Sequence, residues 1–141
     1  MSSRIPPRLA REVRERAGDV CEYCLLPQES QEATFHVDHV VPRSRGGATT
    51  LDNLALACVT CSLRKAARHR ARDPQSRKLV PLYNPRSDDW TDHFAFTKGW
   101  RLSGRSPTGR ATIEALGMNR AAVIAIRREL VQLGRFPAEV E

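Results

Sequence analysis

The sequence predicts an α+β fold, in which one small domain of helices and short strands carries an appendage. Three observations support this prediction. Four cysteines fall into two Cys-x-x-Cys pairs, an alternating β-branched segment lies between those pairs, and apolar residues recur at helical spacing near both ends of the chain. A chain of 141 residues is also too short for a TIM barrel or a full doubly wound sheet.

Residues 8–17 predict the first helix. Leu9, Val13 and Ala17 are spaced four apart and form one apolar stripe. Two prolines precede this segment, and Gly18 is a favourable helix terminator.

Residues 19–73 hold all four cysteines, paired as Cys21-x-x-Cys24 and Cys58-x-x-Cys61. Each pair can turn two thiolates toward one centre, and two pairs complete a tetrahedral site that suits Zn2+ and leaves no open position. A redox pair and four free thiols are the competing interpretations. Redox Cys-x-x-Cys motifs usually occur singly on a βαβ unit, which this chain lacks. The spacing therefore predicts a structural zinc site.

The segment between and after the two cysteine pairs predicts a strand, a loop, a return and a helix. Thr34–Val41 alternates and is rich in β-branched residues, so we expect a strand that Pro42 ends. Residues 44–47 are a polar, glycine-containing loop, and Leu51–Leu54 lies near the return strand or turn. Ser62–Arg72 has helical propensity and carries five cations and no acid.

Residues 74–141 contain no cysteine. Residues 81–90 are broken by prolines and predict irregular structure, whereas His93–Ser103 predicts a hairpin that turns at Lys98-Gly99. Two helices follow, at about 109–116 with Thr108 as N-cap and at about 120–133 with Asn119 as N-cap.

These segments predict a core over residues 8–73 and a C-terminal extension over residues 74–141 that packs on the core as a hairpin and two helices. We expect His93 to pack or hydrogen-bond structurally. We expect Arg127 and Arg128 to be exposed. The core face of the last helix should consist of Val123, Ile124, Ile126, Leu130 and Leu133.

The charge balance favours a nucleic acid as partner. Lys+Arg number 23 against 16 Asp+Glu, which gives a net charge of +7, and twenty of the 23 cations are arginine. Arginine binds phosphate through two hydrogen bonds, which lysine does not. A high-GC genome would account for part of this arginine excess. No apolar run approaches the length of a membrane span, and no apolar stretch follows the N-terminal cations, so we expect a cytoplasmic protein with reduced cysteines and no membrane partner.

Asp38-His39 is the chemically unusual pair, because neighbours on a strand point to opposite faces. A histidine with a near-neutral pKa can deprotonate water, and a carboxylate can hold a divalent ion against a phosphate. Taken alone, the pair is better interpreted as a surface histidine beside a surface aspartate.

The pair lies within a longer pattern, Val37-Asp38-His39-Val40-Val41-Pro42, Gly46-Gly47, Asn53-Leu54 and Cys58-x-x-Cys61-x-x-x-Lys65. Together with the first cysteine pair, this pattern resembles the HNH endonuclease family over roughly residues 8–72. The resemblance implies a small zinc-stapled ββα-metal finger with an N-terminal helix and a C-terminal extension. It implies that the protein hydrolyses DNA phosphodiester bonds with a divalent ion, Mg2+ or Mn2+, in addition to the structural Zn2+. The C-terminal half, with Leu82-x-Asn84-Pro85-Arg86 and Trp90-x-x-His93-Phe94, resembles a tail found with some small bacterial HNH proteins.

The resemblance also assigns roles by position. His39 corresponds to the general base, Asp38 to a ligand of the catalytic ion, and Asn53 to the residue that holds the finger loop or orients the base. Lys65 lies where a basic residue that contacts phosphate usually follows the second cysteine pair.

Ser62 departs from the family pattern, because this metal-binding position usually carries His or Asn. A serine hydroxyl is a shorter and weaker ligand than an imidazole or an amide oxygen. His36 lies on the same strand face as Asp38. It is either an additional ligand, a residue that supports a ligand through a hydrogen bond, or an exposed residue with no chemistry.

The nucleic-acid-binding residues that we expect are Arg43, Arg45, Arg64, Lys65, Arg68 and Arg70. The main alternative is a nucleic-acid-binding zinc module with weak or lost catalysis because of Ser62. An RNA-directed nuclease is a third alternative. A double-strand cut by one finger would require two copies, as in a homodimer, or two events.

Overall fold

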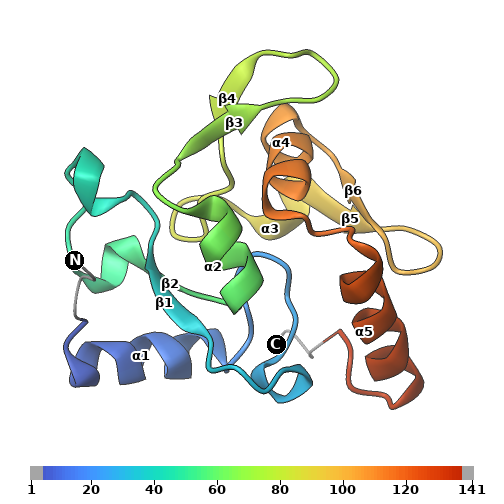
Figure 1. Ribbon diagram of the computed structural model, residues 1–141, viewed down its shortest axis with the longest axis horizontal. Coiled ribbons are helices and arrows are strands. Elements are labelled where there is room, and N and C mark those ends of the chain that lie inside the picture. The colour runs from blue at the N-terminus through green and yellow to red at the C-terminus, as the bar shows by residue number, and fades with distance from the viewer. Residues whose placement is uncertain (1–4, 138–141) are drawn as a thin grey trace.

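A computed structural model describes residues 5–137 and confirms the predicted α+β class (Figure 1). Over these residues, three two-stranded antiparallel sheets alternate with helices. Residues 138–141 of the expected extension lie outside the described residues. The helices are α1 (Pro7–Ala17), α2 (Val59–Lys65), α3 (Trp90–His93), α4 (Pro107–Leu116) and α5 (Ala121–Gln132). The strands are β1 (His36–His39), β2 (Leu54–Ala57), β3 (Arg70–Arg72), β4 (Leu79–Pro81), β5 (Phe94–Phe96) and β6 (Leu102–Gly104), and short 3-10 turns are η1 (Gln28–Ser30), η2 (Arg43–Arg45) and η3 (Leu51–Asn53).

Helix α1 has nearly the predicted extent, and its apolar stripe faces the core. Val13 is fully buried, and Leu9 and Ala17 pack against the same core. Gly18 ends the helix in the left-handed conformation at φ +62°, where its N–H and the next one satisfy carbonyls of the last turn. The prediction for this helix is confirmed.

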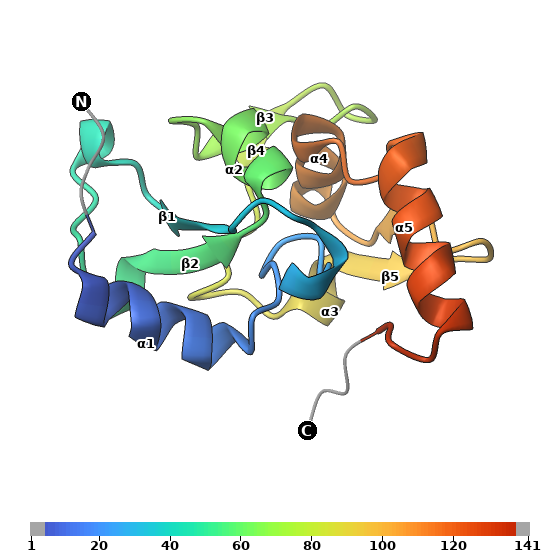
Figure 2. The same cartoon turned by 60° about the horizontal axis from the view of Figure 1, so that its bottom comes forward.

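Strands β1 and β2 form a hairpin that lies between α1 and α2 (Figures 1 and 2). The register pairs His36 with Ala57 and His39 with Leu54. All four residues of β2 are buried, because helices cover both faces of this short sheet. Strand β1 is shorter than the predicted Thr34–Val41, because after His39 the backbone bonds to Asn53 instead of continuing the ladder.

The helix predicted over Ser62–Arg72 is wrong in its second half. Helix α2 ends at Lys65, Ala66 takes φ +51°, and Arg70–Arg72 forms strand β3 against β4. Tertiary pairing outweighs helix propensity here, because β3 buries Ala71 and leads into the buried Asp73.

The C-terminal extension contains the predicted β5–β6 hairpin, but the predicted caps are wrong. Ser106 caps α4 instead of Thr108, and its Oγ accepts a hydrogen bond from the N–H of Gly109 at 2.9 Å. Asn119 does not cap α5, because its side chain makes two hydrogen bonds to the backbone of Leu102. The short helix α3 and the β3–β4 hairpin were not predicted.

Helix α5 buries part of the predicted set of side chains. Val123 and Leu130 are buried and Ile126 packs against the same core, whereas Leu133 is 62% exposed. Arg127 is fully buried instead of exposed, because its guanidinium donates to the carbonyls of Trp100 and Met118 and lies over the Phe96 ring. Within residues 5–137, no helix has the length and apolar character needed to cross a membrane.

The finger (residues 8–73) and the C-terminal extension (residues 74–137) share one hydrophobic core. Its buried members come from α1, the cysteine pairs, β2, β5, α4 and α5, and Trp90 of α3 donates to the Tyr23 carbonyl beside the first cysteine pair. Helix α4 packs directly against α2. The extension therefore helps to fix the position of the helix that faces β1.

Asp73 connects the β3–β4 hairpin to α4. Its fully buried carboxylate accepts two hydrogen bonds from Arg110, at 2.9 and 2.8 Å, and further ones from the N–H groups of Gln75 and Ser76. These hydrogen bonds, above all those from Arg110, hold the pKa of Asp73 well below its usual range.

We predict that Asp73→Asn destabilises the protein at neutral pH and that this difference shrinks at low pH. The lowered folded-state pKa means that the carboxylate stabilises the fold above the unfolded pKa of about 3.9 and loses this effect as pH falls below that value. Urea unfolding of both proteins at several pH values between 7 and 2 measures the difference. The control Asp92→Asn, at an exposed site, should change stability by less than about 0.5 kcal/mol. A wild-type-to-Asp73→Asn difference that stays constant across this range would contradict the prediction.

Candidate functional site

The two cysteine pairs converge on one buried centre. The four Sγ atoms lie within 4.8 Å of one another, and Cys24 Sγ lies 3.8 Å from Cys58 Sγ. A separation of about 3.8 Å is the edge of a tetrahedron whose centre lies about 2.3 Å from each sulfur, which is the Zn–S bond length. Within each pair the second N–H donates to the first Sγ at 3.4 Å, which is the tight turn that the spacing predicts. The cluster therefore fits a tetrahedral metal ion.

The electrostatics of the cluster favour bound positive charge. Hydrogen bonds from the three neighbouring thiols hold the pKa of Cys58 well below that of an ordinary thiol. The pKa values of Cys24 and Cys61 are raised, first by hydrogen bonds within the cluster and then by burial. A dication at the centre would let all four thiols ionise.

Cys58 joins this centre to the finger. It follows β2 directly and begins α2, so the cluster fixes the angle between strand and helix. The face of α2 that packs on β1 presents Ser62 and Lys65, one turn apart.

Two polar pairs connect that face to β1. His36 Nδ1 lies 2.9 Å from Ser62 Oγ, and Lys65 Nζ lies 3.0 Å from Asp38 Oδ2. Lys65 Nζ also donates to the His39 carbonyl at 2.9 Å. Lys65 is only 1% exposed, so the expected contact between this side chain and phosphate does not fit its position. Its ammonium instead holds the Asp38-His39 backbone and carboxylate in place.

Burial raises the pKa of Asp38, and the neighbouring Lys65 acts in the opposite direction. Oδ2 has an ion-pair distance to Lys65 but no partner in hydrogen-bond geometry among residues 5–137. The carboxylate therefore keeps unused acceptor capacity, which suits a ligand of a hard cation.

His39 is 9% exposed, and its Nε2 lies 2.8 Å from Thr49 Oγ1 in the loop between β1 and β2. Burial is the main reason why the pKa of His39 is lowered, and this shift favours the neutral ring that a general base requires. A hydroxyl on one ring nitrogen fixes the orientation of the ring and directs the other nitrogen elsewhere. Nothing in the spacing of Thr49 pointed to this role.

The side chain of Asn53 makes hydrogen bonds within the loop between β1 and β2, residues 40–53, which we call the finger loop. Its Oδ1 accepts from the Val41 N–H at 2.9 Å, and its Nδ2 donates to the carbonyls of Val41 and Ala48. Arg16, which the sequence did not single out, reaches from α1 to donate to the carbonyls of Leu51 and Leu54 on either side of Asn53.

Residues 21–68 match the family model for HNH endonuclease. Over residues 21–68 the chain is therefore similar to an HNH endonuclease domain, and we call this segment the HNH domain. No curated protein and no solved structure is significantly similar to the chain. An HNH domain indicates a nuclease or nucleic-acid-binding function, and the family generally uses a divalent metal ion.

The residues of the HNH domain fit a catalytic ion less completely than they fit zinc. Among residues 5–137, only the four cysteines bring together three or more His, Cys, Asp or Glu ligand atoms. A hard divalent ion would have Asp38 and the hydroxyl of Ser62, with His36 beside them, and would take its other ligands from water and substrate. This composition suits Mg2+ or Mn2+, which commonly bind through one or two carboxylates plus substrate phosphates.

The arginines that we expect to bind nucleic acid are exposed but do not all lie together. Arg43 is close enough to His39 to contribute to its lowered pKa. The guanidinium of Arg64 instead lies against Gly117, in the turn between α4 and α5. Arg45, Arg68 and Arg70 line one cleft.

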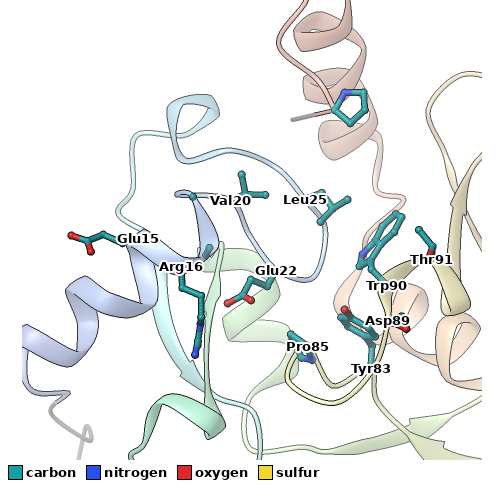
Figure 3. A pocket seen from close by; sticks show the side chains of 13 residues that line it. Glu15, Arg16, Val20, Glu22, Leu25, Tyr83, Pro85, Asp89, Trp90 and Thr91 are labelled. Carbon is teal, nitrogen blue, oxygen red and sulfur yellow. The ribbon is translucent and has the colours of Figure 1, made fainter. Parts of the chain in front are cut away.

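Figure 3 shows a different hollow, a groove of about 650 Å³ on the α1 side of the molecule. Its lining includes Arg16, Glu22, Tyr83 and Trp90 and none of the site residues predicted from the sequence. A hollow shape alone therefore does not mark the HNH site.

Gly47 supports the site through a close backbone approach. A Cβ at this position would lie 1.8 Å from the Val41 carbonyl oxygen and 2.8 Å from Asn53 Nδ2. We predict that Gly47→Ala lowers the free energy of unfolding by about 2–3 kcal/mol, because the loop must move off its Asn53 anchor. Gly46→Ala is the matched control, since its Cβ meets nothing within 4 Å and its φ of +86° costs only about 1 kcal/mol. Urea unfolding compares the two, and an equal or smaller loss for Gly47→Ala would contradict the prediction.

Proposed function

We propose that this protein is a metal-dependent endonuclease that hydrolyses DNA phosphodiester bonds, with His39 as the general base. The observation that carries the proposal is the position of His39, whose Nε2 lies 2.8 Å from Thr49 Oγ1, next to the largely buried carboxylate of Asp38, which pairs with Lys65. The net charge of +7 supports a polyanionic substrate. DNA is preferred to RNA because the family resemblance implies it.

His39 would act through Nδ1. His39 Nε2 lies 2.8 Å from Thr49 Oγ1. In the tautomer whose Nε2–H donates to that hydroxyl, Nδ1 would keep its lone pair and take the proton of the attacking water. The water oxygen bonds to phosphorus, the bond to the 3′ oxygen breaks, and that oxygen takes a proton from solvent. Asn53 keeps the loop that carries Thr49 in register with β1.

Asp38 and Ser62 would hold the catalytic ion, with His36 as the candidate for the missing strong ligand. A divalent cation held there would stabilise charge on the phosphate and on the leaving 3′ oxygen. His36 Nδ1 already lies within hydrogen-bond distance of Ser62 Oγ, so both side chains are on the face that Asp38 shares. Lys65 would position Asp38 and His39 through its contacts with the Asp38 carboxylate and the His39 carbonyl.

The second candidate is a nucleic-acid-binding module with weak or lost catalysis. The observation that favours it is that the described residues around Asp38 provide no converging set of three His, Cys, Asp or Glu ligands, while Lys65 already neutralises the carboxylate. The two candidates differ in cleavage and agree in binding.

A supercoiled-plasmid assay with Mg2+, Mn2+ and Ni2+, against EDTA, separates the candidates. His39→Ala should slow cleavage by about 100-fold or more, the contribution of a general base, and leave DNA affinity in EDTA unchanged. Thr49→Val should slow cleavage by roughly 10-fold, whereas Thr49→Ser, which keeps the hydroxyl, should restore most of the rate. Cleavage by His39→Ala at the wild-type rate would contradict the catalytic assignment. No cleavage by the wild type with any metal would favour the binding module.

We also propose that the four cysteines bind one structural Zn2+. Cys58→Ser should remove most of the folding free energy, because metal binding and folding are coupled when the ligands come from separate segments. Metal analysis of purified protein should give one zinc per chain, and Co2+ exchanged into the site should show thiolate-to-metal absorption. A folded protein without zinc, whose melting temperature a chelator does not change, would contradict this assignment.

A further inference from the structure

A basic cleft of about 540 Å³ lies where the finger loop meets the base of the β3–β4 hairpin. Arg45 of η2 lines one side, and Arg68, His69 and Arg70 line the other, with Ala67 and Leu79 completing the wall. No carboxylate is part of this lining. None of Asp38, His39, Asn53 or Ser62 lines it either, so the cleft is separate from the proposed reaction centre.

The early end of α2 creates this cleft. Ala66 turns the chain at φ +51°, and the Arg68 N–H bonds to the Lys65 carbonyl. The His69 carbonyl accepts from the Leu82 N–H at 2.9 Å, and Arg70 pairs with Pro81 in the β3–β4 ladder. A continuous helix would instead have distributed residues 68–70 around its circumference.

The charges in the cleft are unbalanced. Burial first, and then the cations of Arg45, Arg70 and Lys65, lower the pKa of His69. His69 Nδ1 is buried and has no hydrogen-bond partner among residues 5–137. Arg45, Arg68 and Arg70 all line this space, and Arg68 Nη2 also donates to the Arg64 carbonyl at 2.7 Å. Their like charges repel each other, and an anion among them would both offset that repulsion and accept hydrogen bonds.

We propose that Arg45, Arg68, His69 and Arg70 form a binding site for one backbone phosphate of the DNA substrate, outside the reaction centre. The site would clamp the strand between the finger loop and the extension. The choice of DNA rests on the proposed function, whereas the anion-binding chemistry rests on the cleft itself. Guanidinium forks suit phosphate oxygens, and a phosphate contact of this kind positions the duplex without reading its sequence.

Binding of a fluorescent duplex by full-length protein in EDTA, at several salt concentrations, tests the proposal without any hydrolysis. Arg45→Ala and Arg70→Ala should each weaken binding roughly ten-fold and lower the slope of log affinity against log salt by about 0.9. Because both side chains share one phosphate, the double variant should lose clearly less than the product of the single losses. Arg128→Ala, which removes an exposed arginine from α5, is the matched control and should change affinity by less than about two-fold.

Histidine NMR provides the second readout. The ring signals of His69 should shift when the duplex is added and should not shift in Arg45→Ala/Arg70→Ala, whose unchanged melting temperature shows that the fold is intact.

Independent, fully multiplicative losses of duplex affinity, or losses no larger than that of Arg128→Ala, would overturn the proposal. A shift with inorganic phosphate but not with duplex would overturn the assignment to DNA. Plasmid cleavage distinguishes this proposal from the proposed function. If the wild type cuts DNA and the cleft variants bind normally, only the phosphate-site proposal is refuted. If the wild type binds through the cleft and does not cut, only the endonuclease proposal is refuted.

Discussion

The convergence of four cysteines at the junction of β2 and α2 is the constraint on which the rest of the structure depends. Cys58 directly follows β2 and is the N-cap of α2. The angle between strand and helix is therefore set by the cluster and not by apolar packing alone. The two pairs come from segments 33 residues apart, and bringing them together closes the loop that contains β1. With eight aromatic residues in 141, the chain has few large side chains that could fix this geometry in another way.

That fixed angle holds the buried polar groups of β1 and α2 close enough to pair with each other. Lys65 is a fully buried cation, which is stable only because Asp38 and the His39 carbonyl surround its ammonium. The same contact orients the Asp38 carboxylate and the backbone of His39. Structural and chemical roles are therefore coupled at this interface, since any ion that binds Asp38 must share the carboxylate with a lysine that the fold requires. Such sharing weakens a metal site and is consistent with the departure at Ser62.

The sequence predicted the features that depend on local spacing and missed those that depend on tertiary contacts. Cysteine spacing predicted the metal cluster, the alternation of Phe94 and Phe96 predicted β5, and Gly18 predicted the end of α1. The residues after Lys65 have helical propensity, and only their pairing with β4 makes them a strand. Arg127 and Thr49 act through partners remote in sequence, so no local pattern distinguishes them from surface residues. Among the residues assigned by resemblance, Lys65 was expected to contact phosphate, and its burial was not foreseen.

The early end of α2 connects the finger to the extension. Helical propensity alone would carry α2 through Arg72, with its arginines dispersed over a solvent-exposed face. Strand β4 and the Asp73–Arg110 pair instead draw residues 70–73 away from the helix axis and hold them against α4. His69 and Arg70 thereby come to line the same cleft as Arg45 from the finger loop. The extension thus does more than cover the core, because without its pairing the basic residues that follow the finger would have no common direction.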